Sequence, residues 1–137
     1  MILNFTQHAA TPEQIAQGVV DLPEARRQEL CQLLTFEELP APADVRFRAE
    51  MVADLYYEVI EDLGADLEAP TTEGWPSVMV GGAPFFMGPL ESALISMGLE
   101  GKVLYAFSRR ESVEETQPDG SVVKRNVFRH VGFVYND

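Results

Sequence analysis

The chain has 137 residues, of which 46% are hydrophobic and 23% charged; this suits one globular domain over residues 1–137 and excludes disorder by composition. The formal net charge of -12 repels phosphate backbones, so duplex nucleic acid is excluded as an expected partner, whereas a small nucleotide still fits a local pocket. The single cysteine, Cys31, excludes an internal disulfide and a thiolate metal cluster, and its apolar neighbours predict a packing role.

No segment approaches the ~20 apolar residues of a membrane helix, and the N-terminal sequence lacks the basic and apolar regions of a signal peptide. We therefore expect a cytoplasmic protein that makes no membrane contact.

The N-terminal segment predicts a buried strand over residues 2–6 followed by a short helix. In Thr11-Pro12-Glu13-Gln14 the threonine and glutamine form a capping-box pattern, and the proline suits the first helical position. Gly18 would lie inside this helix and weaken it. The apolar face of the helix is predicted to consist of Ile15, Val19 and Val20.

Two further helices are predicted before the second strand. Asp21-Leu22-Pro23-Glu24 places a capping acid before a proline, which marks a second helix start. Apolar residues at steps of three or four predict a long helix over residues 43–63. The acidic, turn-rich stretch 65–76 is expected to form a loop.

The second strand is predicted over residues 77–82 and ends in Gly81-Gly82. Residues 83–88 are expected to be a loop in which Phe85 and Phe86 serve as core or lid. Pro89 would open the next helix, and Gly98 would end it. A third strand is predicted over residues 103–107.

A C-terminal hairpin is predicted around Asp119-Gly120, a strong turn signal between two strand-like runs. With these two as the central turn residues, the opposing pairs are Glu115 with Lys124, Glu114 with Arg125, and Arg109 with His130. A bulge would shift this register.

The order of elements predicts an α/β fold, specifically a small Rossmann-like three-layer domain with a short parallel sheet and a C-terminal antiparallel hairpin. Ligands of open α/β sheets bind beyond the carboxyl ends of the parallel strands. That edge is predicted to carry Thr6, Gln7, His8, Gly81, Gly82, Phe107, Ser108, Arg109 and Arg110.

These residues favour a small anionic or nucleotide-type ligand. Helix N-termini near Thr11 and Pro89 would present free N–H groups, the glycines permit close approach, and arginines bind phosphate or carboxylate. Ligand binding is therefore assigned to Thr6, Gln7, His8, Gly81, Gly82, Ser108, Arg109, Arg110 and His130. If a phosphodiester is cleaved, the catalytic residues would be His8, Ser108 and Arg110. No metal and no cofactor is implied.

Structural roles remain open for several of these residues. His8 alternatively caps the turn, Gly81-Gly82 alternatively makes only a sharp bend, and His130 suits a sheet face. Because Arg109 and Arg110 alternate along a strand, at most one would serve a given pocket. A G-x-S-x-G elbow, an HExxH motif and the standard nucleotide fingerprints are all absent.

Three blocks of sequence carry a resemblance: residues 4–14, which contain the pattern N-F-T-Q-H-x-x-T-x-x-Q, residues 105–112 and residues 128–133. They resemble a group of small uncharacterised bacterial and prophage proteins, a likeness that implies no function. The N-terminal fifth is also similar to small CRISPR-associated accessory proteins with a CARF-type, ring-nuclease-like fold, through His8, Thr11, Gln14 and Leu22-Pro23. That resemblance implies binding or cleavage of cyclic oligoadenylates.

The leading hypothesis is a nucleotide or phosphorylated-ligand binding domain, with a homodimer as one arrangement and weak metal-independent phosphodiester cleavage as an option. One alternative is a non-enzymatic, acidic protein-interaction factor of phage or prophage origin. Another is an orphan enzyme acting on a small metabolite.

Overall fold

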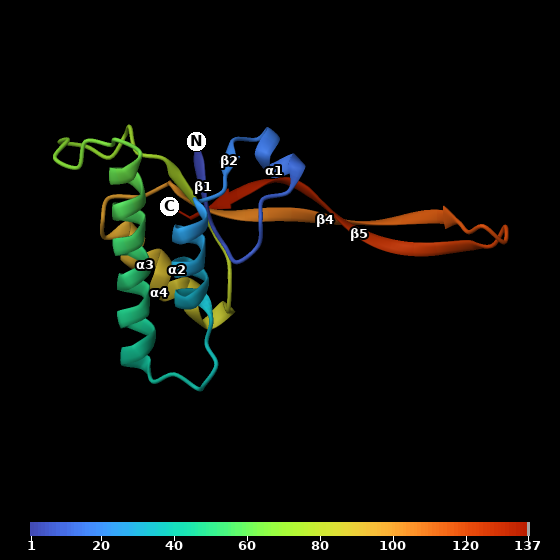
Figure 1. Ribbon diagram of the computed structural model, residues 1–137, viewed down its shortest axis with the longest axis horizontal. Helices are drawn as coiled ribbons and strands as arrows, with labels where there is room; N and C mark the ends of the chain where they lie inside the picture. The colour runs from blue at the N-terminus through green and yellow to red at the C-terminus, as the bar shows by residue number, and fades with distance from the viewer. Residues whose placement is uncertain (137) are drawn as a thin grey trace.

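The computed structural model describes residues 1–136, in which five strands form one sheet with helices packed on it (Figure 1). The strands are β1 (Ile2–Phe5), β2 (Val19–Val20), β3 (Ser77–Val80), β4 (Val103–Thr116) and β5 (Val122–Tyr135). The helices are α1 (Pro12–Ala16), α2 (Glu24–Leu34), α3 (Pro42–Asp62) and α4 (Pro84–Ile95). The sheet order is β2-β1-β3-β4-β5, parallel except for β5. The predicted α/β class, with its short parallel sheet and C-terminal hairpin, is confirmed.

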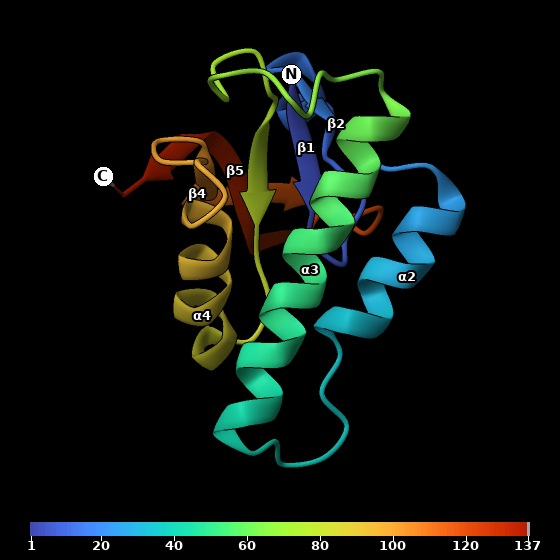
Figure 2. The same cartoon turned by 90° about the vertical axis from the view of Figure 1, so that its left-hand side faces the viewer.

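The helices are distributed unequally over the two faces of the sheet. Figure 2 shows α2, α3 and α4 on one face, in front of β1 and β3. Parallel connections are right-handed, and the step from β1 to β2 runs opposite to the later steps, so α1 lies on the other face (Figure 1). Within residues 1–136, no helix is long and apolar enough to cross a membrane.

The main core lies between the sheet and helices α2 to α4. Alternate residues of the central strands, such as Phe5 and Val80, point into this core and are almost fully buried. Tyr56 of α3 and Phe86 of α4 meet them from the helical layer. Met79 points to the opposite face, where α1 and the base of the hairpin cover part of the sheet.

The structure corrects two predictions near the N-terminus. Gly18 adopts a φ of 100°, a backbone conformation that favours glycine, and follows the end of α1 instead of lying within it. Val19 and Val20 consequently form the edge strand β2 and not the apolar face of a helix. Asp21 does not cap α2, whose N-cap residue is Pro23 without a side-chain hydrogen bond.

Helix α4 starts earlier than predicted. Residues 83–88 are not a loop, because α4 begins at Pro84 and Pro89 lies inside it. Burial of Phe86, Leu90 and Leu94 along one side of the helix outweighs the N–H that Pro89 lacks. The carbonyl deprived of that hydrogen bond belongs to Phe85, which is half exposed in the first turn and reaches water.

The third strand continues into a C-terminal hairpin, as predicted, but the predicted register of the outer part of the hairpin is wrong by one residue. Gly120 has a φ of 86° in a three-residue turn, which pairs Glu114 with Lys124 and Ser108 with His130. The predicted register applies only on the inner side of a bulge at Phe107/Ser108, where Ala106 pairs with Phe133. The strand predicted over residues 103–107 therefore continues to Thr116.

The adjacent phenylalanines of α4 provide a matched test of this packing. Phe86→Ala should lower the free energy of unfolding by about 3–5 kcal/mol, because it empties a fully buried site. Phe85→Ala should cost about 1 kcal/mol or less, since Phe85 is 52% exposed and packs mainly on Phe36. Urea denaturation followed by circular dichroism measures both, and equal losses would contradict the placement of Pro84 at the helix start.

Candidate functional site

A pocket of about 530 Å³ lies at the carboxyl ends of β1 and β3, beside Tyr105 and Ala106 of β4. It is lined by residues 6–9, 11, 14, 79–82, 84, 87, 105 and 106. The structure thus brings together the predicted ligand-binding residues Thr6, Gln7, His8, Gly81 and Gly82. Thr11, Gln14, Met87 and Tyr105 complete the lining, although the sequence reasoning did not assign these side chains to the site.

The buried side chain of Asn4 fixes the shape of the wall that carries His8. Its Nδ2 donates hydrogen bonds to the His8 carbonyl oxygen (2.8 Å) and to Asp21 Oδ1 (2.7 Å). Its Oδ1 accepts from the Thr6 N–H (3.0 Å) and the Thr6 hydroxyl (2.7 Å). Asp21 Oδ1 also accepts from the Ala10 N–H at 3.0 Å. The turn after β1 is therefore held from within, and the polar residue in Ile2-Leu3-Asn4-Phe5 was the available signal.

The opposite wall is formed by the two glycines after β3 and by the start of α4. A Cβ on Gly81 would lie 3.2 Å from Thr6 Cγ2, so glycine lets the ends of β1 and β3 approach closely. Gly82 has a φ of 152°, outside the region that most side chains accept. The N-cap residue of α4, Ala83, makes no side-chain hydrogen bond. In the first turn Pro84 has no N–H and the Phe86 N–H donates to the Ala83 carbonyl oxygen at 2.9 Å, which leaves the Phe85 N–H for another partner.

Only one of the two predicted helix N-termini offers such donors. At α1, the Thr11 hydroxyl accepts from the Gln14 N–H at 3.2 Å, and Gln14 Oε1 accepts from the Thr11 N–H at 3.0 Å. This capping box is confirmed, and it occupies N–H groups that were predicted to be free. Pro89 is not a helix start. The helix N-terminus on the Gly81-Gly82 wall of the pocket is therefore the beginning of α4, which starts at Pro84.

The residues that line the pocket include no aspartate, glutamate, lysine or arginine. Tyr105 is the lining residue with a shifted ionisation: partial burial, followed by its 2.7 Å hydrogen bond to Glu91 Oε2, raises the pKa of its hydroxyl. This hydroxyl stays protonated near neutral pH and donates to Glu91. The pocket is consequently uncharged apart from any charge on His8.

The remaining predicted site residues lie outside this pocket. Ser108, Arg109 and Arg110 are exposed, since β4 continues past the sheet and carries them away from the ends of β1 and β3 (Figure 1). His130 joins β5 to α1: its Nε2 lies 2.9 Å from Gln17 Oε1, and its ring centroid lies 4.8 Å from that of Phe133. The geometry gives His130 a structural contact at the base of the hairpin.

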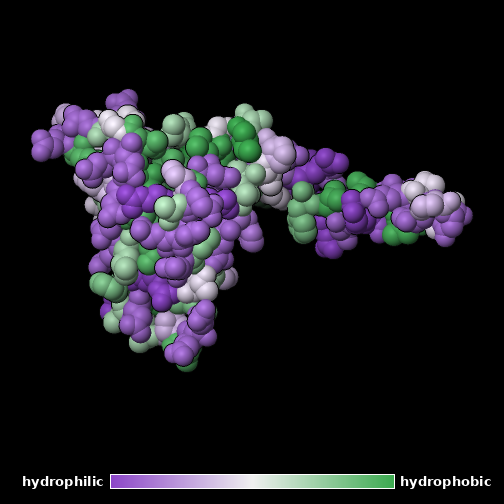
Figure 3. All heavy atoms as spheres, viewed as in Figure 1, coloured by the Kyte–Doolittle hydropathy of each residue, from purple (hydrophilic) through white to green (hydrophobic). Residues whose placement is uncertain are grey.

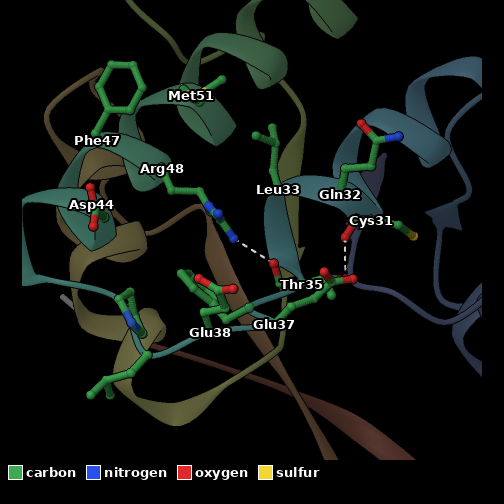
Figure 4. A pocket seen from close by; sticks show the side chains of 13 residues that line it. Cys31, Gln32, Leu33, Thr35, Glu37, Glu38, Asp44, Phe47, Arg48 and Met51 are labelled. Carbon is green, nitrogen blue, oxygen red and sulfur yellow. Dashed lines mark hydrogen bonds between the residues drawn. The ribbon is translucent and has the colours of Figure 1, made fainter.

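A second cavity, a groove of about 810 Å³, lies between the end of α2 and the start of α3 (Figure 4). Arg48 Nη1 donates to the Thr35 carbonyl oxygen at 2.6 Å, and its guanidinium carbon lies 4.3 Å from the centre of the Phe36 ring. Cys31 lines this groove and is partly buried. The groove also carries the carboxylates of Glu37, Glu38 and Asp44, and does not suit an anionic ligand.

Residues 1–136 contain no group of three or more His, Cys, Asp or Glu side chains arranged to hold a metal ion. The acidic residues Glu58 and Asp62 of α3 instead bind Arg26 of α2, at 2.9 Å and 3.0 Å. Hydrogen bonding to Asp62 raises the pKa of the Arg26 guanidinium, and these ion pairs tie the two helices together.

The fold and the pocket define an α/β protein with an uncharged ligand-sized cavity at the carboxyl ends of parallel strands. Over residues 1–134 the chain matches the family described as the uncharacterized protein MJ1673 family, and it belongs to that family. No curated protein and no solved structure matches the chain.

The Asn4 hydrogen bonds can be tested by mutation. Asn4→Ala should lower the free energy of unfolding by about 1–3 kcal/mol, because it leaves the Thr6 N–H without its acceptor and removes the donor shared by the His8 carbonyl and Asp21. The control Asn126→Ala, at an exposed position of β5, should change it by less than about 0.5 kcal/mol. Urea titration measures both variants. A loss for Asn4→Ala no larger than the control would show that Asn4 does not hold the turn.

Proposed function

We propose that this pocket binds a small anionic ligand of the nucleotide or phosphorylated type, in the cytoplasm. The observation that carries the proposal is a cavity without carboxylates whose wall includes Gly81, Gly82 and Pro84, where β3 passes into the start of α4. Backbone N–H groups and the positive end of the helix dipole favour an anion at such a position. With no lysine or arginine in the lining, a phosphate would bind backbone N–H groups near Gly81 and Gly82 together with uncharged polar side chains such as Gln7.

The rest of the pocket suits the organic part of such a ligand. Its volume of about 530 Å³ lies within the range of small-molecule sites. Met79, Met87 and the ring of Tyr105 offer apolar surface for a flat heterocycle. Gln7, His8 and Thr11 supply polar groups that can bind its edges.

The arrangement supports binding more strongly than catalysis. Of the residues proposed for phosphodiester cleavage, only His8 lines the pocket, whereas Ser108 and Arg110 lie on the extended part of β4. A single histidine could donate a proton, but no second titratable side chain of the proposed catalytic set lines the pocket beside it. The proposed activity is therefore binding of the ligand without turnover.

Isothermal titration with AMP, ADP, cyclic oligoadenylates and adenosine tests this function. We expect micromolar binding of at least one phosphorylated probe, about tenfold or more tighter than adenosine, since a tenfold change corresponds to about 1.4 kcal/mol. Equal affinity for AMP and adenosine would contradict phosphate recognition at α4. Absence of binding to every probe would refute the proposal.

The position of the site is tested separately with two variants. His8→Ala should weaken binding of the best probe about tenfold, because it removes a side chain that lines the pocket. The matched control Arg110→Ala removes an exposed side chain outside the pocket and should leave the affinity unchanged. A larger loss for Arg110→Ala than for His8→Ala would move the site to the hairpin.

A further inference from the structure

The outer part of the hairpin, residues 106–131, projects from the body and is called the arm here (Figure 1). Strand β3 pairs with β4 only through Val103, Leu104 and Tyr105. From residue 106 outward, β4 and β5 pair only with each other among the described residues. Eleven residues of β4, 106–116, correspond to about 36 Å of extended chain. A two-stranded ribbon of this kind is marginally stable in water on its own.

The two faces of the arm differ in whether their side chains form ion pairs across the strands. One face carries the ion pairs Glu111–Arg129 and Glu115–Arg125, which join diagonal neighbours across the strands. The opposite face presents Phe128, which is 72% exposed, opposite Arg110, and Val122, which is 58% exposed, opposite Thr116. We call this second surface the Phe128 face. Figure 3 shows hydrophobic atoms interrupting the hydrophilic surface along the arm.

The exposed area of the chain exceeds that of a compact monomer. The chain exposes 8612 Å², whereas a compact monomer of 15.2 kDa exposes about 7100 Å² by the usual surface scaling. The excess is about 1500 Å², and a standard protein interface buries about 800 Å² on each partner. The arm therefore offers enough surface for a stable dimer.

Charge is divided between the arm and the body in a way that favours a second copy as the partner. The arm holds five basic and four acidic residues, a net charge of +1, which leaves five basic and eighteen acidic residues, a net charge of -13, elsewhere in the chain. Two such bodies repel each other, but an arm can approach an acidic body without this penalty. On the Phe128 face Lys124 lies opposite Glu114, and Arg110 supplies the remaining positive charge.

The base of the arm provides the complementary surface. The arm leaves the body beside α1, where Gln17 Nε2 donates to the Val131 carbonyl oxygen at 3.2 Å. Near this base Ile15 of α1 is 57% exposed. In a two-fold dimer with antiparallel arms, the tip of each arm reaches the base of the other. The same apolar residues would then be covered in both copies.

We propose that the arm is a dimerisation element, whose Phe128 face lies against the arm and arm base of a second copy of this chain in a two-fold arrangement. The Phe128 face lies outside the pocket, although Ala106 at the base of the arm and Gln14 of α1 belong to the pocket lining. The proposed dimer does not require the proposed ligand. In the dimer, the second copy packs on the two-stranded ribbon, which has no helical layer of its own, and it removes the side chain of Phe128 from water.

Light scattering coupled to size-exclusion chromatography tests this proposal at 10–100 µM protein. Wild-type protein should have twice the 15.2 kDa mass of one chain. Phe128→Glu should be monomeric, because it places a carboxylate in the apolar contact. The matched control Phe47→Glu changes a phenylalanine that is 64% exposed on the body, outside the arm, and should remain dimeric.

Three results would overturn the proposal. Wild-type protein that is monomeric at 100 µM would exclude the dimer, whether or not the arm then binds another macromolecule. A Phe128→Glu variant that is still dimeric would exclude the Phe128 face. Dissociation by Phe47→Glu to the same extent would place the contact on the helical layer. Circular dichroism confirms that each variant is folded, and failure of nucleotide binding alone changes none of these outcomes.

Discussion

The buried amide of Asn4 determines the geometry on which the pocket depends. It satisfies the backbone and side chain of Thr6, the carbonyl of His8 and the carboxylate of Asp21 at once. A buried polar group costs free energy unless it is hydrogen-bonded, so this network either forms completely or destabilises the core of the sheet. The turn that carries Gln7 and His8 is consequently fixed by the sheet itself and not by the ligand.

The same network connects the segment after the edge strand β2 with the turn after β1. Asp21 lies between β2 and α2, and by accepting from Asn4 and Ala10 it joins the edge strand to the turn after β1. On the opposite wall, Gly81 packs against Thr6 at a distance that leaves little room for a side chain. The pocket is therefore formed by three pieces of backbone held close together, and its polarity comes largely from N–H groups and amide side chains.

The protein combines an acidic body with a nearly neutral arm, and the two have different physical requirements. The body buries its apolar residues between sheet and helices, as Phe5, Tyr56 and Phe86 show. The arm has no such layer, so its apolar residues remain at the surface. Net charge of this size favours solubility but opposes association, which makes a neutral extension the natural part through which two copies could meet.

The sequence by itself determined every strand except the two-residue β2, most helix positions and five of the residues that line the pocket. Local signals were sufficient there: the capping box at Thr11, the helical period of α3 and the strand that ends in Gly81-Gly82. They failed where long-range packing outweighed a local preference. Helix α4 continues through Pro89 because burial of Phe86 stabilises it. Gly18 adopts a positive φ after α1, and Val19 and Val20 then form a strand.

Only the tertiary structure decided which polar residues meet. The sequence placed Ser108 and Arg110 beside His8 because they follow the third parallel strand, but pairing with β5 extends β4 beyond the sheet. It also could not show that Asn4 reaches Asp21, seventeen residues away, since that contact exists only after β1 and β2 pair. Local periodicity specifies which elements form, whereas hydrogen-bond partners distant in the chain depend on how those elements pack.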